Sequence, residues 1–80
     1  MKIEISTPSK SIAPQEVSQV LLPGEKGELM ILPGHAHLIT RLGSGALSFQ
    51  NKGETKTFNI SGGVAKVKND QIVVACDSLL

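Results

Sequence analysis

Polar and apolar residues alternate along most of this chain, and this alternation restricts the possible folds more than any other feature. Ile3 and Ile5 have polar neighbours, and the same pattern recurs at Leu47 and Phe49. A period of two places the apolar side chains on one face of a β-strand, whereas an amphipathic helix needs a period of 3.6. No segment shows the capped amphipathic pattern of a helix. The sequence therefore predicts an all-β fold.

Turn signals separate the alternating segments at intervals of about 8 to 12 residues. Proline presets a φ near −65°, and glycine supplies the positive φ that a type II turn needs at its next position. Reversals are predicted at Leu22-Pro23-Gly24 and at Leu32-Pro33-Gly34. Asn51-Lys52-Gly53 predicts a three-residue hairpin loop, and Asn69-Asp70 predicts a two-residue type I′ turn. Ser61-Gly62-Gly63 indicates a bulge or a close approach of two backbones.

The segments between these turns predict a β-sandwich. Eighty residues allow one domain at most, and short strands with regular turn signals are typical of a sandwich or a barrel. We predict a single small β-sandwich of about nine to ten short strands in two sheets. The expected strands span residues 2–7, 9–13, 16–22, 27–31, 38–42, 46–51, 54–60, 63–68 and 71–75.

Composition argues against several classes of partner. Eight basic residues are offset by seven acidic ones, and only two residues are aromatic. A nucleic-acid-binding surface normally has a basic stripe or stacking rings, so a free-standing oligonucleotide-binding barrel is disfavoured. Cys76 is the single cysteine, which excludes an intramolecular disulfide, and its apolar neighbours predict a small buried side chain. The N-terminus lacks a signal-peptide pattern, and no apolar run reaches the ~20 residues of a membrane span, so a cytosolic or peripheral protein is expected.

His35 and His37 are the main candidates for site chemistry. In an extended strand, residues two apart lie on the same face, a spacing that zinc sites use. Glu28 or Cys76 would have to supply a further ligand. Two histidines at this spacing are far more often ordinary surface or turn residues. A small metal-binding or catalytic β-domain using His35, His37 and Glu28 is therefore kept only as the alternative function. No paired carboxylate, catalytic triad or nucleotide fingerprint is present, so we predict an interaction module without a cofactor or metal, not an enzyme.

Five motifs occur in an order that resembles a known family. They are LPGxxGE from Leu22, LPGHA from Leu32, Leu42-Gly43, FxISGGxAxV from Phe58, and VVACD ending at Asp77. This order resembles the N-terminal β-sandwich domain of the epsilon subunit of F-type ATP synthases, which is called delta in mitochondria. The resemblance covers essentially all of residues 1–80, so the whole chain is expected to be one epsilon-type domain.

The resemblance implies a non-catalytic subunit of the central rotor stalk. Such a subunit binds the gamma subunit and rests on the membrane c-type ring, and it couples ion flow to ATP synthesis in catalytic sites that belong to other subunits. It is peripheral, on the cytoplasmic face of the bacterial inner membrane or on the stromal face of a plastid thylakoid. The isolated domain is expected to be monomeric and not to bind nucleic acid.

The resemblance also assigns residues by their place in the motifs. Glu28 matches the family's acidic residue facing the ring, and His35 matches its histidine at the gamma contact. Two positions depart from the usual pattern, because His37 is commonly proline and Met30 is often glycine. The family's C-terminal helical hairpin, which inhibits ATP hydrolysis and in some members binds ATP, is absent from these 80 residues, so that inhibitory function is not expected of this chain. The implied partner interface comprises Glu28, Met30, Gly34, His35, Ser61 and Gly62.

Overall fold

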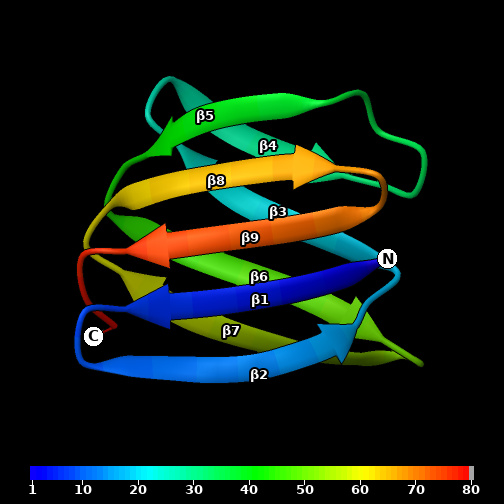
Figure 1. Ribbon diagram of the computed structural model, residues 1–80, viewed down its shortest axis with the longest axis horizontal. Helices are drawn as coiled ribbons and strands as arrows, with labels where there is room; N and C mark the ends of the chain where they lie inside the picture. The colour runs from blue at the N-terminus through cyan, green and yellow to red at the C-terminus, as the bar shows by residue number, and fades with distance from the viewer. Residues whose placement is uncertain (80) are drawn as a thin grey trace.

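A computed structural model describes residues 1–79, and nine β-strands account for most of them (Figure 1). The all-β prediction is confirmed. Within the described residues, no helix is long and apolar enough to cross a bilayer. The strands are β1 (Lys2–Thr7), β2 (Lys10–Glu16), β3 (Gln19–Gly24), β4 (Gly27–Ile31), β5 (Leu38–Leu42), β6 (Gly45–Asn51), β7 (Glu54–Ile60), β8 (Gly63–Lys68) and β9 (Gln71–Cys76).

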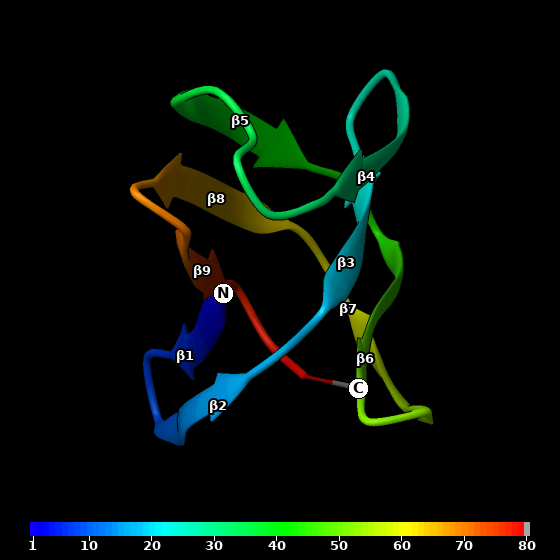
Figure 2. The same cartoon turned by 90° about the vertical axis from the view of Figure 1, so that its right-hand side faces the viewer.

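The strands form two layers that face each other across the core (Figure 2). One layer has the order β2-β1-β9-β8-β5, and the other contains β4, β3, β6 and β7. The two layers meet at one corner, where β3 and β5 pair only through Gly24 and Leu42. Hydrogen bonding therefore runs through one curled nine-stranded sheet, and the predicted small β-sandwich is confirmed.

The corner is held by two backbone hydrogen bonds. The Gly43 N–H donates to the Pro23 carbonyl oxygen over 2.8 Å, and the Glu25 N–H donates to the Arg41 carbonyl oxygen over 3.0 Å. Gly24 is needed here, because a Cβ atom at this position would collide with the carbonyl oxygen of Gly27. The first Pro-Gly pair thus forms the junction between the layers.

The core lies between the layers and is built from the alternating inward positions of both. In β9, for example, Ile72, Val74 and Cys76 are buried while the residues between them are exposed. None of the described polar or charged residues is buried, so apolar burial holds the layers together. The remaining core residues are Ile3, Ile5, Val17, Val20, Leu22, Ile31, Leu42, Leu47, Phe49, Ile60, Ala65 and Val67.

Strand β1 pairs with β9 in parallel, from Lys2 opposite Gln71 to Ser6 opposite Ala75. The two strands lie side by side although they come from opposite ends of the described chain (Figure 1). The other pairs of named strands among residues 1–79 are antiparallel. This parallel pair joins the β1–β2 hairpin to the β8–β9 hairpin within the larger layer.

Two of the predicted turns are confirmed. The His35 N–H donates to the Leu32 carbonyl oxygen over 3.1 Å, and Gly34 has the positive φ, 83°, of a type II turn. Asn69 and Asp70 have φ values of 50° and 59° and connect β8 to β9 as a two-residue hairpin turn, as predicted.

Two other turn predictions are wrong in part. The loop after β6 has two residues, Lys52 and Gly53, because Asn51 already pairs with Glu54; the predicted left-handed glycine is present, with a φ of 83°. The chain also does not reverse at Pro23-Gly24. Strand β3 continues through Gly24, and the reversal follows at residues 25–26.

Proline chemistry explains why β2 and β3 are longer than predicted at their C-terminal ends. In a two-residue hairpin the closing pair, here Gly24 with Gly27, is hydrogen-bonded, and the next pair along the ladder is not. Pro23 and Glu28 form that next pair, so the absence of an N–H group on Pro23 removes no hydrogen bond between β3 and β4. Pro14 lies in the edge strand β2, opposite a register irregularity between Ile3 and Ile5, a place where proline is tolerated. The predicted strands 9–13 and 16–22 are observed as Lys10–Glu16 and Gln19–Gly24. The predicted start of the second strand is wrong, because Glu16 ends β2 and residues 17–18 connect the two strands.

Candidate functional site

Among the described residues, five large apolar side chains are substantially exposed. Ile39 is the most exposed, at 70%. Single exposed apolar residues are ordinary, but a contiguous group marks a contact surface. The five residues are Met30, Leu32, Ile39, Val64 and Val73.

Strand register brings three of these residues together on the outer face of β5, β8 and β9. Val73 is opposite Lys66, and Lys66 is opposite Ile39. In the next row, Val64 is opposite Arg41. Residues opposite each other in a sheet lie on the same face. We call this surface, defined by Ile39, Arg41, Val64, Lys66 and Val73, the outer face; it is apolar with basic residues interspersed.

The turn that contains Gly34 and His35 is exposed and lies beyond the end of β4. His35 Nδ1 lies 2.7 Å from the Ala36 carbonyl oxygen; because that oxygen only accepts, Nδ1 carries the proton. The Gly34 N–H donates to Asp70 Oδ1 over 2.8 Å. His37 Nε2 lies 3.3 Å from Asn69 Oδ1. Asn69 and Asp70 of the β8–β9 turn therefore contact the segment that leads into β5.

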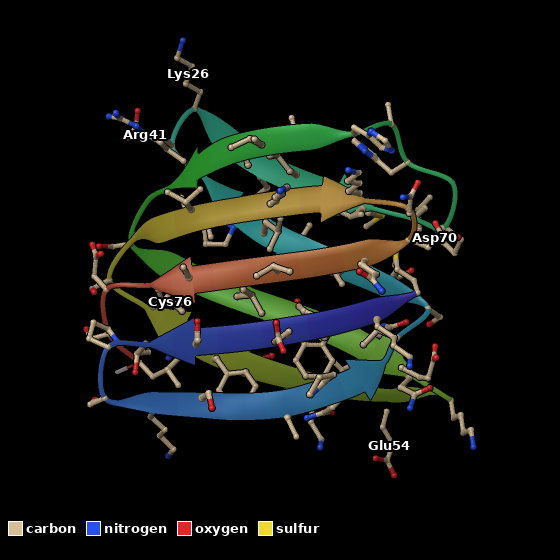
Figure 3. The ribbon with its side chains drawn as sticks, in the orientation of Figure 1. Lys26, Arg41, Glu54, Asp70 and Cys76 are labelled. Carbon is tan, nitrogen blue, oxygen red and sulfur yellow. The ribbon has the colours of Figure 1, made fainter. Side chains whose placement is uncertain are left out.

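Glu28 lies at the opposite end of β4 from His35. It pairs with Pro23, next to the β3–β4 hairpin, and lines a hollow together with Lys26 and Arg41. Figure 3 shows Lys26 and Arg41 at one end of the sandwich and Asp70 at the other. The residues implied by the resemblance thus form two separate groups, and the charges near Glu28 are mixed in sign.

Ser61 and Gly62 make contacts inside the fold. The Ser61 hydroxyl is 2.8 Å from the Ser78 hydroxyl. Gly62 is buried, and its carbonyl oxygen accepts a hydrogen bond from the Asp77 N–H over 3.0 Å. The adjacent Gly63 is the predicted close backbone approach, since a Cβ atom there would lie 2.8 Å from the Cα atom of Cys76. A partner contact for Ser61 and Gly62 stays a prediction.

The structure gives no support to a metal site at the two histidines. His35 and His37 lie in an irregular segment and not in a strand, so the same-face argument does not apply to them. Glu28 belongs to the other end of β4. Among residues 1–79, no three His, Cys, Asp or Glu side chains gather in a group that could hold a metal ion.

Cys76 is buried at the end of β9, as its apolar neighbours predicted. Burial, and secondarily the charge of Asp77, raise the pKa of the Cys76 thiol above its ordinary value. A nucleophilic cysteine needs the opposite change, because the thiolate is the reactive form. Cys76 is therefore a packing residue.

Sequence reasoning predicted a turn at Asn69 and Asp70 but did not assign these two residues, or the outer face, to the candidate site. One signal for Asp70 was available in the sequence. Glycine fits best at the second position of a type I′ turn, so an aspartate there indicates that its side chain has another role. The available signal for the outer face was Ile39, an isoleucine beside Leu38 that breaks the alternation of β5.

Comparison with known proteins identifies similar chains over the whole length. The family model described as "ATP synthase, Delta/Epsilon chain, beta-sandwich domain" matches residues 1–80. The chain is 43% identical over 77 residues to the ATP synthase epsilon chain of Desulforamulus reducens and 40% identical over 78 residues to that of Carboxydothermus hydrogenoformans. These alignments cover 96% and 98% of this chain and 58% of each relative. The chain thus spans less than two thirds of the length of the curated relatives that it matches.

Solved structures share the fold. A chain of the Euglena gracilis mitochondrial ATP synthase, in a structure of its OSCP/F1/c-ring, has a TM-score of 0.89 and 23% identity, with 98% of this chain and 51% of that chain covered. A chain in the central stalk/c-ring structure of the Tetrahymena thermophila mitochondrial ATP synthase has a TM-score of 0.84 and 19% identity, with 99% and 64% covered. At these identities the likeness concerns the β-sandwich itself.

Proposed function

This chain belongs to the β-sandwich family of ATP synthase delta/epsilon chains, and on that premise we propose that it is a non-catalytic subunit of the rotor stalk of an F-type ATP synthase. It binds the gamma subunit and the membrane c-type ring, and it couples ion flow to ATP synthesis by holding the two together. The observation that carries this proposal is the match of the family model to the entire chain, residues 1–80. The protein is peripheral, on the cytoplasmic face of the membrane or its plastid equivalent.

A coupling role requires two surfaces that can be occupied at the same time. Glu28 lies beside the β3–β4 hairpin, whereas Gly34 and His35 follow the other end of β4. We assign Glu28 to the ring and the turn at Gly34 and His35 to gamma, with Met30 between them. The separation of these groups supports simultaneous contact with two partners, because neither partner need cover the other's residues. Ser61 and Gly62 line a hollow with Glu25 at the same end of the sandwich as Glu28, and we keep them in the partner interface.

The outer face supports a protein partner and not a small ligand. Its exposed side chains come from three neighbouring strands, with Ile39 opposite Lys66 and Lys66 opposite Val73. Apolar side chains with Arg41 and Lys66 between them, and with Glu4 opposite Val73 at the border with β1, fit a partner surface with an apolar centre and charged edges. We include the outer face in the gamma contact, because β5 follows directly from the turn that carries His35. Its Ile39 and Arg41 also line the hollow that contains Glu28, so the two proposed contacts adjoin there.

The test is binding of the chain to its cognate gamma subunit, measured at micromolar concentration by co-elution and by titration calorimetry. We expect a one-to-one complex. Ile39→Asp should weaken it by about tenfold or more, because it introduces a charge into a desolvated apolar contact. Thr57→Asp is the matched control, since Thr57 is exposed on β7 in the other layer. Absence of binding by the folded wild-type chain would contradict the proposal, and equal losses in both variants would contradict the assignment of the outer face.

A further inference from the structure

We propose that Asp70 is a positioning residue that fixes the turn of Gly34 and His35 in its partner-binding conformation. Asp70 acts through one hydrogen bond, from the Gly34 N–H to its carboxylate, and itself makes no contact with the partner. The statement about the partner rests on the function proposed above, whereas the statement about the turn does not.

A hydrogen bond connects the turn at Gly34 directly to the β8–β9 turn. The Gly34 N–H and Asp70 Oδ1 are 2.8 Å apart and belong to residues 36 positions apart in the chain. Beside it, His37 Nε2 lies 3.3 Å from Asn69 Oδ1. The turn between β8 and β9 thus holds both ends of the segment from Gly34 to His37. Figure 3 shows Asp70 at that end of the sandwich.

Few other contacts constrain this turn. All residues from Leu32 to His37 are exposed, and a Cβ atom at Gly34 would meet nothing within 4 Å. Packing therefore does not define the conformation of this turn. Its own closing bond, from the His35 N–H to the Leu32 carbonyl oxygen, spans 3.1 Å and fixes only its local shape. The bond to Asp70 is what fixes the turn relative to the sheet.

The side chain at position 70 is also suited to this hydrogen bond. Asp70 has a φ of 59° at the second position of a type I′ turn, where glycine is favoured and other residues are strained. Glycine at position 70 would fit the hairpin turn better, but it has no side-chain oxygen to accept the hydrogen bond from the Gly34 N–H. Aspartate tolerates this conformation less well than glycine, but unlike glycine it supplies an acceptor for the Gly34 N–H.

Holding an exposed turn in one conformation raises affinity, because less conformational freedom is lost when the partner binds. The turn at Gly34 and His35 is the segment that we assign to gamma. Asp70 therefore contributes to affinity without touching the partner, and its contribution is separable from the stability of the fold.

The experiment compares Asp70→Gly with Asp70→Asn. The glycine variant relieves the turn but removes the acceptor, whereas the asparagine variant keeps an oxygen acceptor and tolerates a positive φ. Three quantities are measured: the melting temperature, the exchange rate of the Gly34 amide by NMR, and the affinity for gamma. For Asp70→Gly we expect an equal or higher melting temperature, about tenfold faster exchange at Gly34, and roughly fivefold weaker binding, the loss typical of one hydrogen bond. Asp70→Asn should stay within about twofold of the wild type in exchange and affinity.

A general structural role predicts a different pattern, since affinity would then follow the melting temperature. Unchanged exchange of the Gly34 amide in Asp70→Gly would overturn the proposal, and so would wild-type affinity in that variant. Loss of affinity in Asp70→Asn with normal Gly34 exchange would also overturn it, because the charge and not the positioning would then matter. If the wild-type chain itself does not bind gamma, the proposed function fails and the partner statement with it, while the exchange rates still decide whether Asp70 holds the turn.

Discussion

Gly63 and Gly53 allow the cost of a close backbone approach to be separated from the cost of a positive φ. Both glycines have φ in the region that other residues avoid, 148° for Gly63 and 83° for Gly53. They differ in their surroundings. A Cβ atom at Gly53 would meet nothing within 4 Å, whereas one at Gly63 would lie 2.8 Å from the Cα atom of Cys76 and would collide with the Ala75 carbonyl oxygen. Alanine therefore incurs a penalty for a positive φ at both positions, but it incurs a steric penalty only at Gly63.

The expected magnitudes follow from these distances. Gly53→Ala should cost about 1 to 2 kcal/mol, the penalty for a left-handed conformation. Gly63→Ala carries a penalty of at least that size, because a φ of 148° lies outside the left-handed well in a region that is essentially limited to glycine. It also forces β8 away from β9, because ordinary contact begins at 3.4 Å. Overpacking costs roughly 1 to 3 kcal/mol, and each ladder hydrogen bond that is lost costs about 1 kcal/mol. We expect a total of about 3 to 5 kcal/mol for Gly63→Ala, a large part of the roughly 4 to 12 kcal/mol available to a chain of this length.

Urea unfolding followed by far-UV circular dichroism measures both losses, since the chain has no Trp or Tyr for a fluorescence signal. The two variants should have similar m-values and differ in midpoint, with Gly63→Ala the lower by at least about 2 kcal/mol after conversion. Equal urea midpoints for the two variants would refute the reasoning. They would mean that β8 and β9 can move apart to admit a Cβ atom at position 63 without loss of stability.

Three further predictions concern other parts of the molecule. Glu28→Gln should leave the melting temperature unchanged and weaken attachment to the ring at low salt by at most about fivefold, since exposed ion pairs contribute only about 0 to 1 kcal/mol; equal ring binding by both proteins across a salt series would contradict this. The raised pKa of the Cys76 thiol means that the folded state holds its proton more tightly than the unfolded state, so stability should fall as the pH rises above about 8.5. Cys76→Ala should lack that component of the decrease in a comparison of urea midpoints. Lys52→Asn should raise the melting temperature by a few degrees, corresponding to about 0.5 to 1 kcal/mol, because Lys52 has a φ of 52° in a turn that favours Asn-Gly; an unchanged or lower value would show that Lys52 is not strained.

The fold was predictable because local chemistry and the final structure agree at most positions. Asn69-Asp70 and Pro33-Gly34 form the turns that their φ preferences dictate, and the alternation in β9 matches its burial. Pro23-Gly24 misled the prediction because its role depends on a partner distant in sequence. The pairing of Gly24 with Leu42 turns a strong local turn signal into a corner between layers, and no local pattern reports such a pairing.

The candidate site was less predictable than the fold, for a related reason. Glu28 and His35 were found by their places in motifs, but motifs do not say that these residues lie at opposite ends of one strand. The outer face arises from register, because Ile39, Lys66 and Val73 come from three strands and become neighbours only when β5, β8 and β9 are paired. Asp70 was missed because its hydrogen-bond partner is 36 residues away.

The parallel pairing of β1 with β9 has a consequence for synthesis of the protein. Ribosomes add roughly 5 to 20 residues per second, so the partner strand at Gln71 is made about 3 to 14 s after Lys2. During that interval β1 has only β2 beside it, and its inward side chains Ile3 and Ile5 have no complete core to enter. Contacts between segments so distant in sequence also slow folding after release. The nascent chain therefore lacks the strand that pairs with β1 for seconds, and an unpaired strand edge of this kind is prone to aggregation.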